Sequence, residues 1–141
     1  MGIAIWNEHI ENTLKPLKES YHIGLETGAI EFGCINANMY SIAIYYLGWP
    51  LQKVEEEIRL YSESFTSYKQ GQNRKFNEIY RQSTLNLMGI ANNLTELTGD
   101  AYDEEELIKE NKEHNDRTGT FFYHLHKLML YYHFEDFDKG W

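Results

Sequence analysis

Apolar residues recur at intervals of three and four along most of the chain, and sustained alternation of apolar and polar residues is absent. This spacing places apolar side chains on one face of an α-helix, so it predicts helices rather than strands. The predicted helices cover about residues 6–27, 29–47, 51–68, 74–91, 104–114 and 118–134. Glycines and short polar runs separate them, as is typical of helix ends and turns.

Three of these helices carry features that predict how they pack. Pro16 lies inside the first one, so we expect a kink or a break there. The last one is apolar on two faces, which predicts deep packing between neighbours. The second one has a stripe of large apolar residues and a set of small residues that would let a neighbouring helix approach closely. The stripe is Ile35, Met39, Ile42 and Tyr46, and the small residues are Gly33, Ala37, Ser41 and Ala43.

The six predicted helices form an all-α fold in which consecutive helices pair as three antiparallel hairpins of similar length. Similar hairpins predict a stack like that of tetratricopeptide (TPR) repeats, wound as a right-handed superhelix. Stacking also supplies neighbours for a helix that is apolar on two faces. A closed six-helix bundle is the structural alternative. We expect residues 1–141 to form a single helical-repeat domain, long enough to bury a sizeable core.

Charge and composition narrow the classes of partner. The formal net charge is −9 and the isoelectric point is near 5.1. An acidic surface repels phosphate backbones and anionic lipids, so nucleic-acid and membrane partners are not expected. The sequence shows neither an apolar segment of membrane-spanning length nor a signal-peptide pattern, and we expect a cytoplasmic protein.

The candidate metal-binding and catalytic residues favour structural roles. His124 and His126 are two residues apart and point to different sides of a helix, while His126 and His133 lie about 10 Å apart along it. Neither pair suits a metal ion, and no metal or cofactor is expected. Cys34, with His22 or His124 as its base, could act as a nucleophile, but its small and apolar neighbours favour a buried, inert thiol.

The acidic run at residues 103–106 is typical of a helix start. Asp103 and Glu106 fit a variant capping box, and the other carboxylates suit the positive end of the helix dipole. Adjacent carboxylates on a first turn diverge into solvent and do not face each other across a pocket, as acid–base catalysis requires. Phosphate-binding glycine motifs are absent as well. The sequence therefore predicts no catalytic residues.

Aromatic residues predict a place for binding. Most of the tyrosines have the spacing of core residues, but Tyr45–Tyr46 and Tyr131–Tyr132 are adjacent pairs that cannot both face one core. Some aromatic side chains are therefore expected at a groove, where they would contact a peptide or a partner helix. Residues that could line a pocket between helices are Tyr40, Tyr80, His124 and His126.

Several short runs together resemble one family. They are GLETGAIEFG at 24–33, NMY at 38–40, IYRQ at 79–82, LNLMG at 85–89, YDEEE at 102–106 and residues 115–128, which begin with NDR. Over residues 21–140 the chain resembles the helical region of large, mostly bacterial, multidomain signalling proteins. These proteins combine a Ser/Thr kinase-like domain, an AAA-type ATPase, a helical repeat region, GAF or PAS sensors and a histidine kinase.

The resemblance implies a TPR-like region that lies between the ATPase and the sensor-kinase parts of a larger protein. The catalytic motifs of that family lie outside this region, so the resemblance implies a role without catalytic residues. We expect a non-enzymatic interaction or relay module that docks against the ATPase or kinase domains of its parent chain or against a partner protein. Aromatic anchors with an acidic rim would make that association salt-sensitive, and a homo-oligomer is also possible. The alternatives are a domain that senses a small molecule or peptide between its helices, and a passive spacer.

Overall fold

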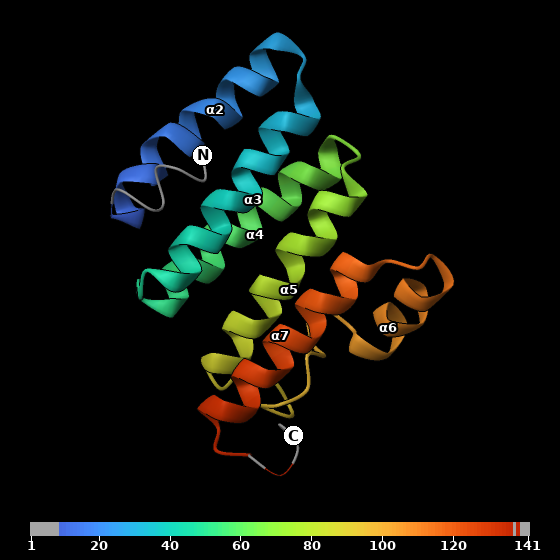
Figure 1. Cartoon of the computed structure of the whole chain (residues 1–141). Helices are drawn as coiled ribbons and strands as arrows, with labels where there is room; N and C mark the ends of the chain where they lie inside the picture. Colours follow the sequence, from blue (N-terminus) through green and yellow to red (C-terminus); the bar gives the residue numbers. More distant parts are fainter. Residues whose placement is uncertain (1–8, 137, 139–141) are drawn as a thin grey trace. The chain divides into compact units, whose positions relative to one another are not determined.

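The computed structural model describes residues 9–136 and 138, and within this part of the chain it contains six α-helices, a short 3-10 helix and no β-strand (Figure 1). The helices are η1 (Ile10–Thr13), α2 (Leu14–Thr27), α3 (Ile30–Tyr46), α4 (Leu51–Ser67), α5 (Gly71–Leu87), α6 (Glu104–Glu113) and α7 (Arg117–His133). The predicted all-α class is confirmed. The stacking of the hairpins, whether TPR-like or as a closed bundle, stays a prediction.

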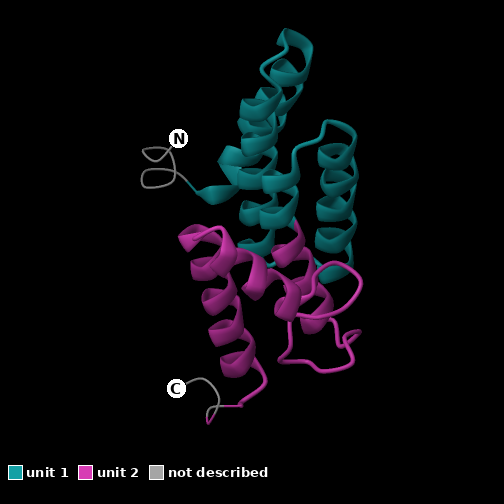
Figure 2. Ribbon diagram, turned by 90° about the vertical axis from the view of Figure 1, so that its right-hand side faces the viewer, with its two compact units in different colours: residues 1–77 teal, residues 78–141 magenta. Residues whose placement is uncertain are grey.

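The chain divides into two compact units, residues 1–77 and residues 78–141 (Figure 2). The first contains α2, α3, α4 and the start of α5, and the second contains the rest of α5, a long loop, α6 and α7. Within the described residues, none of the helices combines the length and apolar character that crossing a membrane requires.

The N-terminal helix differs from the prediction. A 3-10 helix covers Ile10–Thr13, and the α-helix begins at Leu14. Pro16 therefore lies in the first turn of α2, where its missing N–H costs no hydrogen bond, and the change of helix type comes just before it. The predicted start near Trp6 lies outside the described residues.

The boundaries predicted for the fourth helix, 74–91, were wrong at both ends. The ranges predicted for the third and fourth helices left residues 69–73 between them, but α5 already begins at Gly71. The turn lies before it, where Lys69 adopts a left-handed φ of 55° and the Gln70 N–H donates to the Phe65 carbonyl at 2.8 Å. At the other end Gly89, with φ of 77°, stops the helix earlier than the apolar pattern suggested.

Small residues hold α2 and α3 together in the first unit. Gly24 and Gly33 lie so close that a Cβ added to Gly24 would be 2.6 Å from the Gly33 Cα atom. Ala37, Ser41 and Ala43 are buried on the same helix as Gly33, as predicted for the small positions. The backbones of the hairpin therefore touch directly, without large side chains between them.

Asparagines form a buried polar seam in the same unit. The Asn38 amide donates to the Asn73 side chain at 2.8 Å. One turn further along α5, the Asn77 amide donates to the Ile58 carbonyl and to the Ser62 hydroxyl, each at 2.8 Å. These bonds join α3 and α4 to the start of α5, and their requirement for matching partners favours one register of the helices.

The deep packing predicted for the last helix was wrong. Only His126, Lys127 and Leu130 of α7 are buried, while three large side chains of this helix are more than half exposed. The reason lies in its neighbour, because α6 is short and polar and buries a single residue, Asn111. Such a helix provides little apolar surface, so a second apolar face of α7 stays uncovered.

Candidate interaction surface

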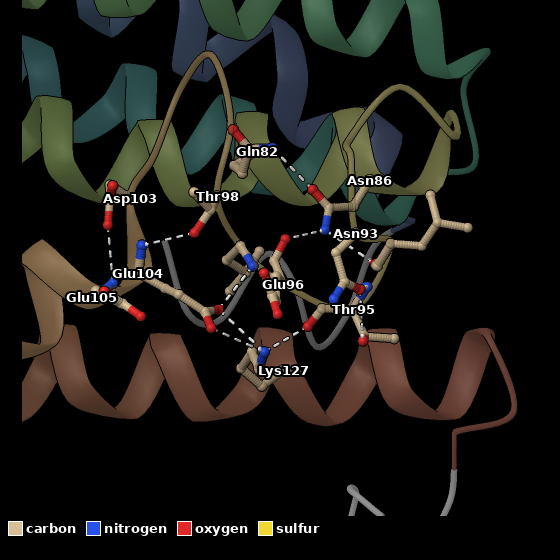
Figure 3. A network of polar contacts seen from close by, with 12 residues as sticks. Gln82, Asn86, Asn93, Thr95, Glu96, Thr98, Asp103, Glu104, Glu105 and Lys127 are labelled. Atoms are coloured by element: carbon tan, nitrogen blue, oxygen red, sulfur yellow. Dashed lines mark hydrogen bonds and ion pairs between the residues drawn. The ribbon is translucent and has the colours of Figure 1, made fainter.

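A buried lysine anchors the loop that precedes α6. The Lys127 ammonium, on α7, donates to the Thr95 carbonyl and lies 3.1 Å from the Glu104 carboxylate (Figure 3). The same carboxylate accepts a 2.8 Å hydrogen bond from the Leu97 N–H. Lys127 and Glu104 are 9% and 15% exposed at their side chains, so this ion pair is largely shielded from water. It ties the first residue of α6 to the middle of α7.

Lys127 stays charged in this setting. Burial alone lowers the pKa of its ammonium, but hydrogen bonds to Tyr131 and Glu104 outweigh that effect, and the pKa is raised overall. The ammonium also lies 5.0 Å from the centroid of the Tyr131 ring, a favourable cation–π distance. The loop is therefore fastened by a permanent cation at physiological pH.

Two amides on α5 fasten the other side of the loop (Figure 3). Asn86 donates to the carbonyls of Leu94 and Glu96 at 3.0 and 2.6 Å, and Gln82 accepts a 3.0 Å hydrogen bond from the Ala101 N–H. Gln82 and Asn86 also bond each other at 2.9 Å. Because these groups satisfy backbone atoms of an irregular segment, the loop holds one shape and fixes the position of α6.

Side-chain caps define where both helices of the α6/α7 hairpin begin. The Asp103 carboxylate accepts from the N–H groups of Glu105 and Glu106, each at 3.1 Å, which confirms the predicted helix start. The Asp116 carboxylate accepts from the Gly119 N–H at 2.8 Å at the start of α7. Both anions lie at the positive end of a helix dipole, where they stabilise the helix.

A groove of about 350 Å³ lies between α6 and α7. Its lining residues are Ile108, Asn111, Lys112, Thr120, Tyr123 and His124. Gly119 lets the two helices approach here, since a Cβ at that position would be 2.9 Å from the Asn111 side-chain oxygen. The groove is lined by one aliphatic residue, one tyrosine and four polar or ionisable side chains.

A separate set of large apolar side chains lies along α7, away from the groove. Phe121, Leu128 and Tyr132 are 60%, 54% and 75% exposed, and Leu125 between them is half-buried. These four residues, which we call the α7 face, follow one another at intervals of four, three and four. That interval keeps them on one side of the helix and is the spacing with which helices pair. The α7 face is thus an exposed apolar strip.

The unit that contains the α7 face carries many acidic side chains. Residues 78–141 contain 13 acidic and 6 basic side chains, a net charge of −7 out of −9 for the whole chain. On α6 the exposed acids include Glu105, Glu106 and Glu113. An apolar strip in a strongly negative unit is complementary to a positively charged, amphipathic partner.

The structure places the four predicted pocket residues at three locations. Tyr80 and His126 are in contact, with ring centroids 4.4 Å apart and the planes at 88°, and both are buried in the core of the second unit. His124 is exposed and lines the α6/α7 groove. Tyr40 lies in the first unit and lines a different depression.

Tyr40 lies at a shallow depression of about 340 Å³ on the first unit. Its hydroxyl donates to the Glu57 carboxylate at 3.4 Å, and the Lys18 ammonium lies 5.3 Å from its ring centroid. Burial, together with the negative charge of Glu57, raises the pKa of Tyr40 to about 12. The phenol is therefore a neutral hydrogen-bond donor at physiological pH.

Cys34, considered above as a nucleophile, is fully buried, and burial raises the pKa of its thiol. His22 and His124, the two bases suggested for it, are both exposed. The predicted buried thiol is confirmed.

Comparison with protein-family models, curated proteins and solved structures finds no match. Likeness to known proteins therefore assigns neither a family nor a function.

Two features of this surface were not anticipated from the sequence. Lys127 was passed over, although a lone lysine inside an apolar helix is a signal for a buried cation with a fixed partner. The exposure of Phe121 and Leu128 was missed because the apolar pattern alone does not say which apolar face is covered.

Proposed function

We propose that this chain is a non-catalytic, α-helical interaction module whose α7 face binds a basic, amphipathic helix of a partner protein. The observation that carries the proposal is the exposed apolar strip of α7 in a unit with a net charge of −7. Strips of this kind rimmed by polar groups are typical of sites where another protein binds.

The wider role rests on the sequence resemblance. In a multidomain signalling protein the basic helix would belong to a neighbouring ATPase or kinase domain, or to a separate partner, and its binding would relay or restrain their activity. A cytoplasmic location is part of the same proposal. The fixed loop and the Lys127–Glu104 ion pair support this role, because they hold the surface in place before binding and so lower the cost of ordering it.

A purified-component experiment tests the proposal directly. Two labelled helical peptides share a leucine seam and differ only in carrying lysine or glutamate beside it, and their binding is followed by fluorescence anisotropy. We expect the lysine peptide to bind and the glutamate peptide not to bind. Raising the salt concentration from about 50 to 500 mM should weaken the lysine complex at least ~10-fold, because charges at a rim are screened.

Matched variants locate the contact. Leu128→Ser on α7 should weaken binding about 10-fold or more, since it removes an apolar anchor. Leu60→Ser on α4 is the control, because Leu60 is 56% exposed and Leu128 is 54% exposed. Neutralising Glu105 and Glu106 to glutamine should reduce the salt dependence. Equal binding of both peptides, or equal effects of the two serine variants, would refute the proposal.

The depression beside Tyr40 supports a second candidate function, the sensing of a small ligand. Lys15, Lys18, Glu19 and His22 border it together with the rings of Tyr40 and Trp49, and the two lysines lie 3.8 and 3.9 Å from the carboxylates of Glu19 and Glu57. A small aromatic carboxylate would replace these acidic partners beside the lysines and pack against the rings. Thermal-shift titration with benzoate and indole-3-acetate, compared with uncharged benzamide, tests this idea. Stabilisation by the acids that disappears in Lys18→Met would support it, and no stabilisation by either acid would reject it.

A further inference from the structure

A second exposed apolar strip runs the length of α3 in the first unit. Its members are Phe32, Ile35, Met39, Ile42 and Tyr46, which we call the α3 face. Phe32, Ile35, Met39 and Tyr46 are 71%, 39%, 42% and 48% exposed, and Ile42 is half-buried. The opposite side of the helix, with Cys34, Ala37 and Ile44, is the side that packs into the core.

The spacing of the α3 face indicates what would cover it. Its members follow at intervals of three, four, three and four, which is the a/d repeat of helices that pair side by side. All five positions are apolar, and the pattern continues without a break over two heptads. An occupant with the shape of an α-helix fits such a strip, because its side chains can interdigitate with these residues.

Charge then favours a particular helix. α3 contains a single charged residue, Glu31, although the chain as a whole carries a net charge of −9. The positions that flank a pairing seam normally select partners by their charges. Here the flanks are Asn36, Asn38, Ala43 and Tyr45 besides Glu31, so they neither attract a charged partner nor repel an identical helix. The α3 face is the long apolar strip of this acidic chain on which two copies can meet with little electrostatic repulsion.

We propose that two copies of this chain associate through their α3 faces, with the two α3 helices antiparallel about a two-fold axis. Met39 lies seven residues from both Phe32 and Tyr46, so it would lie at the axis opposite Met39 of the other copy.

Aromatic side chains offer about 150–250 Å² each, and the exposed parts of the α3 face come to roughly 400 Å² per copy. A pair would bury roughly 800 Å², below the ~1,200 Å² of most stable complexes, so the association is weak and concentration-dependent. The proposal concerns the first unit and does not depend on the basic partner proposed for α7.

Sedimentation velocity of the whole chain, at concentrations up to about 1 mM, tests the proposal. We expect a reversible monomer–dimer equilibrium. Met39→Glu should weaken it at least ~10-fold, because two carboxylates would meet at the axis, while Leu60→Glu on α4 should leave it unchanged. Far-UV circular dichroism of both variants checks that the helices remain.

A charge-swap experiment separates this arrangement from other modes of association. Met39→Glu and Met39→Lys proteins should each stay monomeric alone and should form a dimer when mixed, since opposite charges would then meet at the axis. A monomeric wild-type chain at the highest concentration overturns the proposal. So does a dimer that survives Met39→Glu, or one that Leu60→Glu weakens equally, because α3 would then not be the interface.

Discussion

The fully buried imidazole of His126 makes the stability of the second unit depend on pH. This side chain is 0% exposed and packs edge-on against Tyr80. Burial disfavours the charged form and lowers the pKa of His126 from 6.5 to about 4. The perturbation we consider is acidification from pH 7 to pH 4.5, in the wild type and in His126→Leu.

Whether acid stabilises or destabilises the fold follows from comparing proton binding by His126 in the folded and unfolded chain. The unfolded chain binds a proton on His126 near pH 6.5, whereas the folded chain binds it only near pH 4. Between these values the unfolded state holds more protons, so acidification favours unfolding. The contribution is complete above pH 6.5 and is lost as the pH falls to 4. Its full size is ~3 kcal/mol, and roughly 2.5 kcal/mol of it should disappear between pH 7 and pH 4.5.

Urea denaturation followed by circular dichroism measures this effect. The difference in unfolding free energy between wild type and His126→Leu should change by roughly 2.5 kcal/mol over that pH range. The other titrating groups contribute equally to the free energy of both proteins, so their contributions drop out of the difference. Leu130→Val is the control: Leu130 is also fully buried on α7 but does not titrate, so its effect should be the same at every pH. A pH-dependent change below ~0.5 kcal/mol for His126→Leu would refute the reasoning, since the imidazole would then be hydrated in the folded state.

Two further substitutions test the packing of each unit. Gly24→Ala should destabilise the chain by about 2 kcal/mol, because the new Cβ would be 2.6 Å from the Gly33 Cα. Gly71→Ala, whose Cβ would meet nothing within 4 Å, should be neutral or slightly stabilising, and equal urea midpoints for the two variants would contradict this. Lys127→Met should cost about 3 kcal/mol by leaving the Glu104 carboxylate without its cation, and adding Glu104→Gln should recover part of the loss. An additive double mutant would show that the ion pair is not coupled.

The helices were predictable because their determinants are local. Apolar residues at intervals of three and four are read directly from the chain, and most boundaries fell within a few residues of the prediction. Gly28 and Gly48 end their helices with φ of 81° and 73°, as glycine near a helix C-terminus usually does. The errors in α5 arose where Lys69, a residue without a turn signature, took the left-handed position instead of Gly71.

The buried polar groups were not predictable, since their roles depend on partners far away in sequence. Asn86 bonds carbonyls eight and ten residues ahead, and Lys127 bonds a carbonyl 32 residues back. The lone lysine in an apolar helix hints that Lys127 is buried, but nothing in the local pattern names its partners or separates Asn86 from an ordinary surface residue. For the candidate site, the sequence indicated the acidic helix and the exposed aromatic pairs, whereas the groove and the α7 face required the tertiary structure.

The two exposed strips share a physical origin. One side of α3 carries small residues and another carries large apolar ones. The contact between Gly24 and Gly33 brings the backbones of α2 and α3 so close that only small side chains fit between them. The larger residues, Phe32 and Met39 among them, are thereby left outside. In α7 the cause is instead the polar character of α6.

Each large apolar side chain left in water forgoes about 1.5–3 kcal/mol of burial relative to a covered position. Among the described residues, Phe32 and Tyr132 are the most exposed large apolar side chains, at 71% and 75%, so the fold leaves much of their apolar surface in water. A surface that covers the strips would recover that free energy. This favours the view that both strips are binding faces, one matched by charge to a basic helix and the other, nearly uncharged, to a copy of itself.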